Sequence, residues 1–160
     1  EIQAHHSDGS VILRVSQVQS PAGGLFLATL RALDRGQPFT RASNQMVSAI
    51  TDETLAEAIN RIERRMANGR IEQIYHISPT NAYTSYDLCL MLADAYDLGT
   101  KARKLISPAT LEEIVQSGDQ QVVRPKNSVL DVSKFDRDFP GILHTVEDEI
   151  THFKNLYGKV

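Results

Sequence analysis

The side chains in this sequence that can best hold an anionic ligand lie in one short polar stretch, residues 124–128, which reads Arg-Pro-Lys-Asn-Ser. The Arg124 guanidinium offers a planar fork of donors to diphosphate oxygens, and Pro125 fixes the backbone directly after it. Asn127 and Ser128 can hydrogen-bond a sugar, or they can cap a short helix further along. Arg124 can also be a surface arginine that is bonded to a helix end or a carboxylate. We predict a ligand contact here, with Arg124 as the first candidate.

Gln17 is a second candidate because of the segment that precedes it. Residues 10–16, Ser-Val-Ile-Leu-Arg-Val-Ser, are dense in β-branched side chains. This composition predicts a strand that is buried on both faces, as in a parallel sheet. The carboxyl edge of an open α/β sheet faces the ligand crevice, so a polar residue at the end of this strand is placed to contact a ligand.

Motifs for a dinucleotide, a metal or a catalytic pair do not stand out. The glycines in Ala22-Gly23-Gly24 lack the G-x-G-x-x-G spacing, and Tyr-x-x-x-Lys does not occur. The five histidines form no ligand set. The single cysteine, Cys89, excludes an intrachain disulfide and lies in an apolar run, which favours a buried inert thiol. We therefore predict no catalytic, cofactor-binding or metal-binding residue in this chain.

Composition narrows the class of protein. A net charge of −3 and a pI near 5.9 leave no basic footprint for nucleic acid. No run reaches the roughly 18–20 apolar residues that cross a bilayer, and the first residues do not resemble a signal peptide. We expect a cytoplasmic protein with no membrane and no nucleic-acid partner.

Hydrophobic periodicity predicts alternating strands and helices. Strands are predicted over residues 10–16, 38–42, 46–50 and 74–77. Helices are predicted over residues 25–33, 55–66, 86–98, 109–115 and 146–157. Thr51 or Asp52 can cap the second helix, and the helices starting at 25, 55 and 86 are expected to stop at Gly36, Gly69 and Gly99.

This alternation predicts the α/β class. Only two of the predicted strands have the character of parallel-sheet strands, whereas a doubly wound sheet normally has about six or more. The expected architecture is therefore the C-terminal part of a Rossmann-like doubly wound fold with a helix-rich substrate-binding lobe. We treat residues 1–160 as one region.

The segments taken together resemble one known family, and their order and spacing carry the resemblance. Ile12-Leu13-Arg14-Val15-Ser16 is similar to a family strand written Ile-Leu-Arg-Thr-Ser. Further similar blocks are residues 25–35, 44–56, 74–78 and 83–96, and the signature Arg-Pro-x-Asn-Ser-x-Leu-Asp-x-Ser-Lys at residues 124–134. The family is that of the dTDP-4-dehydrorhamnose reductases, a branch of the extended short-chain dehydrogenase/reductases.

The resemblance implies the sugar-nucleotide side of an NAD(P)-dependent nucleotide-sugar reductase. It places substrate contacts at Asn44 and Gln45 as well, and Gln17 stands where the family commonly has Trp. The glycine motif, the catalytic tyrosine and the NAD or NADP site are expected before residue 1, in an N-terminal cofactor-binding half. This chain alone is then expected to bind no cofactor.

Two alternatives remain open at this stage. The family also contains non-catalytic regulatory subunits that bind a partner enzyme, and related enzymes are nucleotide-sugar epimerases and dehydratases. We also expect the chain to form a homo-oligomer, because the strand at residues 11–16 would expose an unpaired edge without the cofactor half.

Overall fold

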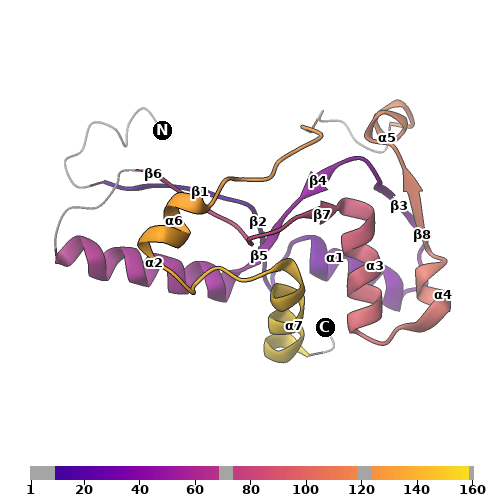
Figure 1. Ribbon diagram of the computed structural model, residues 1–160. Coiled ribbons are helices and arrows are strands. Elements are labelled where there is room, and N and C mark those ends of the chain that lie inside the picture. Colours follow the sequence, from indigo (N-terminus) through magenta and orange to yellow (C-terminus); the bar gives the residue numbers. More distant parts are fainter. Residues whose placement is uncertain (1–9, 69–73, 119–123, 159–160) are drawn as a thin grey trace.

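The computed structural model describes residues 10–68, 74–118 and 124–158, and it confirms the predicted α/β class (Figure 1). Three strand pairs are parallel: β1 (Ile12–Val15) with β6 (Ile74–Ile77), β2 (Gln17–Gln19) with β5 (Ala49–Thr51), and β3 (Phe39–Ala42) with β8 (Ile106–Ala109). One short pair, β4 (Met46–Val47) with β7 (Tyr83–Thr84), is antiparallel. Ser48 separates β4 from β5, within the single strand predicted for residues 46–50.

The helices α1 (Leu25–Asp34), α2 (Asp52–Ala67), α3 (Ser85–Ala95), α5 (Leu111–Gln116) and α7 (Val146–Tyr157) lie close to the predicted positions. The short helices α4 (Gly99–Arg103) and α6 (Ser133–Asp138) had no predicted range. Thr51 caps α2, as predicted, since its side chain accepts a hydrogen bond from the Thr54 amide. The predicted stop of this helix at Gly69 lies outside the described residues. No helix among residues 10–68, 74–118 and 124–158 is both long enough and apolar enough to cross a membrane.

The first strand differs from the prediction. It was expected to be buried on both faces and to end at Gln17, but β1 is only half-buried, Arg14 is exposed, and Gln17 begins β2. Leu13 and Val15 pack against a core cluster, while Arg14 points to the other side. Within the described residues β1 pairs only with β6, so its second edge has no strand beside it.

The third helix is shorter than predicted and is followed by a second one. Instead of running to Leu98 with Gly99 as its stop, α3 ends at Ala95, and Gly99 begins α4. Asp97 adopts a left-handed conformation with φ 55°, which ends the helix without a glycine.

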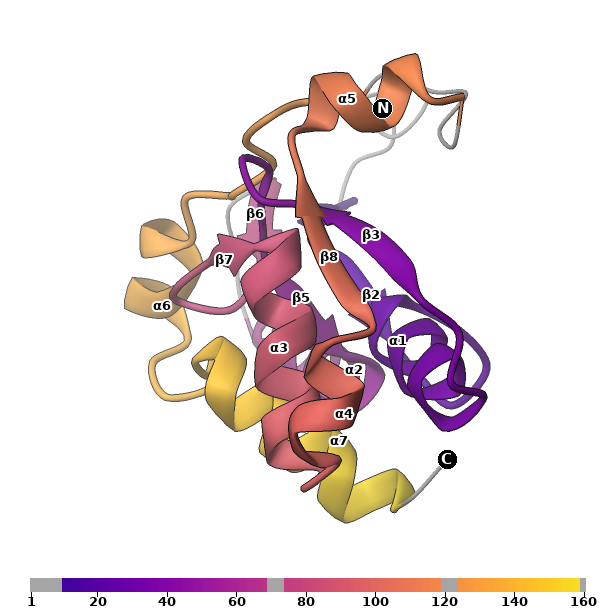
Figure 2. The same cartoon turned by 90° about the vertical axis from the view of Figure 1, so that its right-hand side faces the viewer.

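Three hydrophobic clusters hold these elements together. One lies at the β1–β6 end and joins α2, β6 and α6 through residues such as Ile62, Tyr75 and Phe135. The other two lie on either side of α3, which gives Leu88 and Leu92 to one cluster and Cys89 to the other. Cys89 is fully buried, as predicted. Figure 2 shows the paired strands β3 and β8 with α3 beside them, and this arrangement forms the helix-rich lobe.

A tyrosine on the last helix joins α7 to the start of α2. The Tyr157 hydroxyl donates a hydrogen bond of 2.7 Å to a carboxylate oxygen of Asp52. This bond, with desolvation and the charges of Asp52 and Glu53, raises the pKa of Tyr157 from 10.0 to about 12. Because the folded pKa lies above the unfolded value, the contact stabilises the fold below pH 10.0, and that contribution is lost as the pH rises to about 12.

We expect the substitution Asp52→Asn to return the Tyr157 pKa toward its ordinary value. The ring resonances of Tyr157 followed by NMR across alkaline pH measure this shift directly. The same titration of Tyr83, whose hydroxyl donates to Glu147 and not to Asp52, is the control. An unchanged Tyr157 titration in the variant would contradict the contact.

Candidate functional site

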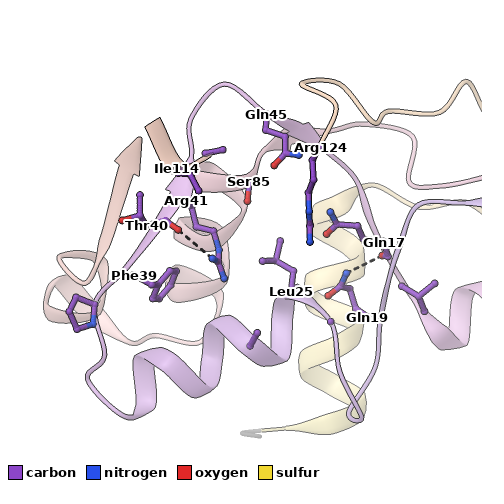
Figure 3. A pocket seen from close by; sticks show the side chains of 15 residues that line it. Gln17, Gln19, Leu25, Phe39, Thr40, Arg41, Gln45, Ser85, Ile114 and Arg124 are labelled. Atoms are coloured by element: carbon purple, nitrogen blue, oxygen red, sulfur yellow. Dashed lines mark hydrogen bonds between the residues drawn. The ribbon is translucent and has the colours of Figure 1, made fainter. Parts of the chain in front are cut away.

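A hollow lies between β2, the start of α1, β3 and α5 (Figure 3). Its volume is about 850 Å³. Its lining residues are Gln17, Val18, Gln19, Gly24, Leu25, Ala28, Pro38, Phe39, Thr40, Arg41, Ala42, Gln45, Ser85, Ile114 and Arg124. Strand–helix connections and one loop from the C-terminal part of the chain thus meet at this pocket.

The charge of the pocket is positive. Among the described residues, its lining contains two arginines, Arg41 and Arg124, and no aspartate or glutamate. Figure 3 shows both guanidinium groups extending into the same space, Arg41 from β3 and Arg124 from the loop that precedes Pro125. Arg41 is half-buried and Arg124 is exposed. Two guanidinium groups on one hollow favour an anionic ligand, because each offers charged donors to its oxygens.

Arg41 has unused hydrogen-bonding capacity. Its Nη1 donates a 3.3 Å hydrogen bond to the carbonyl of Thr40, and its guanidinium carbon lies 4.8 Å from the ring centre of Phe39. Its Nε is buried and has no hydrogen-bond partner among the described residues. Burial raises the pKa of the Cys89 thiol, and the positive charge of Arg41 opposes part of that rise. The guanidinium is thus held inside the fold with donors still available.

The loop that carries Arg124 is fastened to β4 by its neighbours. The Gln45 amide nitrogen donates a 3.2 Å hydrogen bond to the carbonyl of Pro125. The amide and the hydroxyl of Ser128 both bond the carbonyl of Met46, at 3.2 and 3.1 Å. These contacts place Arg124 at the pocket. Among the described residues, the Arg124 guanidinium itself has no carboxylate within ion-pair distance.

A series of polar contacts holds α5 at the rim of the pocket. Asn44 accepts a hydrogen bond of 2.8 Å from the Leu111 amide and donates one of 2.9 Å to Glu112. Glu112 also pairs with Lys126. The Lys126 ammonium and the Asn44 amide lower the pKa of Glu112 to about 2, so this carboxylate stays charged at neutral pH. These contacts fix α5 against the segment that carries Arg124 and Lys126.

Gln17 is the first residue of β2 and lines the pocket next to the start of α1. The Gln19 side chain is fully buried, bonds the carbonyl of Gln17 at 3.0 Å and accepts the Phe26 amide of α1 at 2.9 Å. A side chain at Gly24, where φ is 110°, would meet the Gln19 oxygen at 2.6 Å. Glycine is therefore required there, and Gln19 occupies the space beside it.

Of the six site residues expected from the sequence, the structure brings Gln17, Gln45 and Arg124 to the pocket. The other three lie outside its lining. Asn44 and Ser128 bond backbone or rim groups, and the Asn127 side chain accepts the Val129 amide at 3.0 Å. Neither Asn127 nor Ser128 caps α6, whose first flanking residue is Val132.

Arg41, Phe39 and Ser85 were missed by the sequence analysis. Arg41 lies in a correctly predicted strand, and a charged residue within an otherwise half-buried strand was the available signal.

The glycine turn between β2 and α1 does not have the form of a pyrophosphate loop. Gln19 fills this turn, and the spacing of its glycines is not that of G-x-G-x-x-G. Within residues 10–68, 74–118 and 124–158, no three His, Cys, Asp or Glu side chains gather as metal ligands.

Comparison with known families gives one match. The sequence family described as the RmlD substrate binding domain matches residues 2–158, almost the whole chain. No curated protein sequence matches the chain.

Several solved structures share the fold. A dTDP-4-dehydrorhamnose reductase from Bacillus anthracis in complex with NADP superposes with a TM-score of 0.74 at 16% identity, covering 89% of this chain and 47% of that chain. The Clostridium acetobutylicum orthologue gives 0.74 at 15% identity, covering 91% and 48%. WbmG of Bordetella bronchiseptica, in complex with NAD and UDP, gives 0.65 at 18%, covering 94% and 44%. The chain thus spans about half the length of these structures.

Proposed function

The chain belongs to the RmlD substrate binding domain family, and from this premise we propose that its pocket binds the diphosphate of a nucleotide-sugar. The observation that carries the proposal is the meeting of Arg41 and Arg124 in a hollow that no carboxylate lines. A diphosphate has several charged oxygens, and guanidinium forks bind such oxygens in pairs. The terminal nitrogens of Arg41 would bind the phosphate oxygens, in addition to the 3.3 Å hydrogen bond that Nη1 donates to the Thr40 carbonyl.

The rest of the lining suits the two ends of such a ligand. Pro38, Phe39 and Ile114 make one side of the pocket apolar, which suits the flat face of a base. Gln17 and Gln45 offer amide groups for sugar hydroxyls. The UDP complex of WbmG, a protein of similar fold, supports a nucleoside diphosphate as the ligand class.

We further propose that the whole protein is a nucleotide-sugar reductase that uses NAD or NADP, and that this chain supplies its substrate side. The NADP complex of the Bacillus anthracis reductase supports this assignment. A cytoplasmic location stays a prediction. The alternative of a non-catalytic subunit has a different expectation, because such a subunit has no need to bind the nucleotide-sugar.

Calorimetric titration of the chain with dTDP-glucose tests the proposal. We expect saturable binding, with thymidine, which lacks the diphosphate, binding much more weakly. Addition of excess dTDP should displace the sugar nucleotide. A dissociation constant above about 1 mM, equivalent to roughly −4.1 kcal/mol, or equal affinity for thymidine, would count against the diphosphate site and leave the regulatory alternative.

We predict that the chain has no dinucleotide site of its own. The reason is the filled glycine turn at Gly24. NADH and NADPH should therefore be titrated with the pocket already saturated by dTDP, since their own pyrophosphate can enter it. Binding tighter than about 100 µM, roughly −5.5 kcal/mol, under these conditions would contradict the prediction.

We propose that the free edge of β1 continues into another strand, and that a second copy fills this place when the chain is alone. The edge is flanked by the half-buried side chains of Ile12, Leu13 and Val15. An unpaired strand edge with apolar neighbours is a site for strand addition.

Self-association should be visible by sedimentation velocity at micromolar concentration. The substitution Ile12→Lys places a charge on the edge strand and should shift the chain toward monomer. Val129→Lys, at a residue that is 40% exposed elsewhere on the surface, is the matched control and should leave association unchanged. A wild-type chain that is monomeric and binds no hydrophobic dye would show that it covers β1 itself.

A further inference from the structure

A second hollow lies at the opposite end of the fold, against the C-terminal turns of α2. It has a volume of about 460 Å³ and is lined by Arg61, Arg64, Arg65, Asn68, Asp138, Phe139, Pro140, Gly141 and Ile142. It shares no residue with the first pocket. In Figure 1, α6 lies beside the far half of α2, and the segment after α6 forms the second wall.

The arginines of this wall share one helix face. Arg61, Arg64, Arg65 and Asn68 follow each other at the i, i+3, i+4, i+7 spacing that aligns side chains along a helix. Asn68 donates a 2.7 Å hydrogen bond to the carbonyl of Arg64 and holds the end of the helix. Three guanidinium groups therefore face the same space.

The carboxylates near these arginines already have hydrogen-bond or ion-pair partners. Asp138, the only carboxylate that the described residues give to this lining, accepts the Tyr75 hydroxyl at 2.9 Å and the Arg137 Nε at 3.4 Å. Arg61 pairs with Glu57 at 3.3 Å, in an exposed contact. In the part of the chain that the structure describes, Arg64 and Arg65 have no carboxylate within ion-pair distance.

The helix dipole alone does not account for the positions of these arginines. Arginines in the last turn of a helix favour the negative end of its dipole, and α1 has one such residue, Arg31. In α2, Arg61 lies a turn earlier, and like charges at three- and four-residue spacing repel one another. The buried side chains of Phe139 and Ile142 belong to the same lining, so the exposed arginines stand beside apolar surface.

We propose that this second pocket is a binding site for a small phosphate-bearing molecule whose oxyanion carries at least two negative charges. Three forked donors converge on one hollow, which suits the several oxygens of a phosphate or diphosphate group. The site is independent of the nucleotide-sugar pocket and stands whether or not that pocket binds its proposed ligand.

Inorganic pyrophosphate is the probe, and the chain carrying Arg124→Ala is the background, in which binding at the first pocket is weakened. Calorimetry should show one site that keeps its affinity. In the same background, Arg64→Gln with Arg65→Gln should weaken binding by about a hundredfold, about tenfold for each lost charged contact. Arg31→Gln, which removes a last-turn arginine on another helix, is the matched control and should change the affinity by less than about twofold.

Several results would overturn the proposal. They are the absence of pyrophosphate binding in the Arg124→Ala background, equal weakening by Arg31→Gln, or unchanged affinity in the double variant. A short single-stranded oligonucleotide at matched phosphate concentration should bind no more tightly than pyrophosphate. If it bound much more tightly through Arg64 and Arg65, the hollow would be part of a polyanion surface and not a small-molecule site.

Discussion

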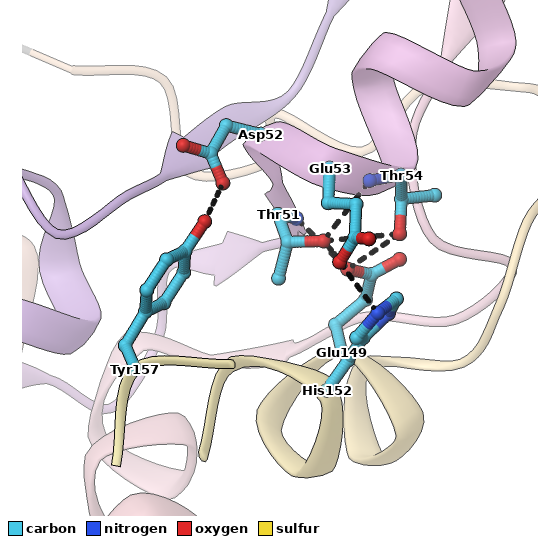
Figure 4. Close-up of polar contacts among 7 residues, drawn as sticks. All are labelled: Thr51, Asp52, Glu53, Thr54, Glu149, His152 and Tyr157. Carbon is cyan, nitrogen blue, oxygen red and sulfur yellow. Dashed lines mark hydrogen bonds and ion pairs between the residues drawn. The ribbon is translucent and has the colours of Figure 1, made fainter. Parts of the chain in front are cut away.

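The substitution Glu149→Ala is expected to lower the free energy of unfolding by about 3–5 kcal/mol, the largest loss that a single polar side chain of this fold should give. Glu149 lies on α7 and is fully buried (Figure 4). One carboxylate oxygen accepts the Thr51 amide at 2.8 Å, the Thr51 hydroxyl at 2.7 Å and the Thr54 hydroxyl at 3.2 Å. Thr51 ends β5 and caps α2, so this carboxylate joins α7, β5 and α2.

The physical reason for the size of the effect is the group of donors that alanine would leave behind. Each buried donor without a partner costs about 1–3 kcal/mol, and the missing side chain adds a cavity. Glu149→Gln keeps an acceptor oxygen, so we expect a smaller loss of about 1–2 kcal/mol. Denaturant unfolding followed by circular dichroism measures both values.

The matched control is Glu63→Ala, an exposed glutamate on α2, which should change stability by less than about 0.5 kcal/mol. If Glu149→Ala destabilised the chain no more than this control does, the carboxylate would not be what holds α7 to the start of α2.

Elements with a clear helical period could be predicted from the sequence. The apolar face of α7 and the threonine cap of α2 are local features, and both were found where expected. The strand β8 was missed because Ile106–Ala109 contains Pro108 and exposes Ser107, and only its pairing with the distant β3 makes it a strand. Likewise Asp97 ends α3 in a left-handed conformation that sequence rules assign first to glycine.

The site was predicted in part for a similar reason. Arg124 and Gln17 were chosen from local motif and strand-end arguments, and both line the pocket. Asn44, by contrast, accepts a hydrogen bond from the amide of Leu111, which is 67 positions away in the sequence. Arg41 is a candidate because it lines the same hollow as Phe39, Gln45 and Arg124. Convergence of residues from separate elements depends on tertiary packing, which single-sequence periodicity does not encode.

Arg124→Ala should weaken binding of dTDP-glucose by about 1.5–3 kcal/mol, roughly ten- to more than a hundredfold. The Arg124 guanidinium enters the pocket from a loop that Gln45 and Ser128 hold in place independently of it. The variant should therefore fold normally and lose only its contact with the diphosphate. Arg124→Lys should recover part of the affinity, because an ammonium supplies charge without the planar fork.

Thymidine separates a phosphate contact from a general change in the pocket. Its affinity should be the same in the wild-type chain and in Arg124→Ala, because it carries no phosphate. Arg31→Ala, an exposed arginine on α1, controls for the loss of one positive charge. If Arg124→Ala left dTDP-glucose binding unchanged, or weakened thymidine equally, Arg124 would have a structural role.

A double-mutant cycle of Arg41 and Arg124 tests the same contact more sharply. If Arg41 and Arg124 hold the same diphosphate, their substitutions to alanine should not act independently, and the double variant should lose less than the sum of the two single losses. Strictly additive losses across the cycle would place the two guanidinium groups on separate parts of the ligand. A coupling of about 0.5 kcal/mol or more would place them on one anionic group, as the shared hollow implies.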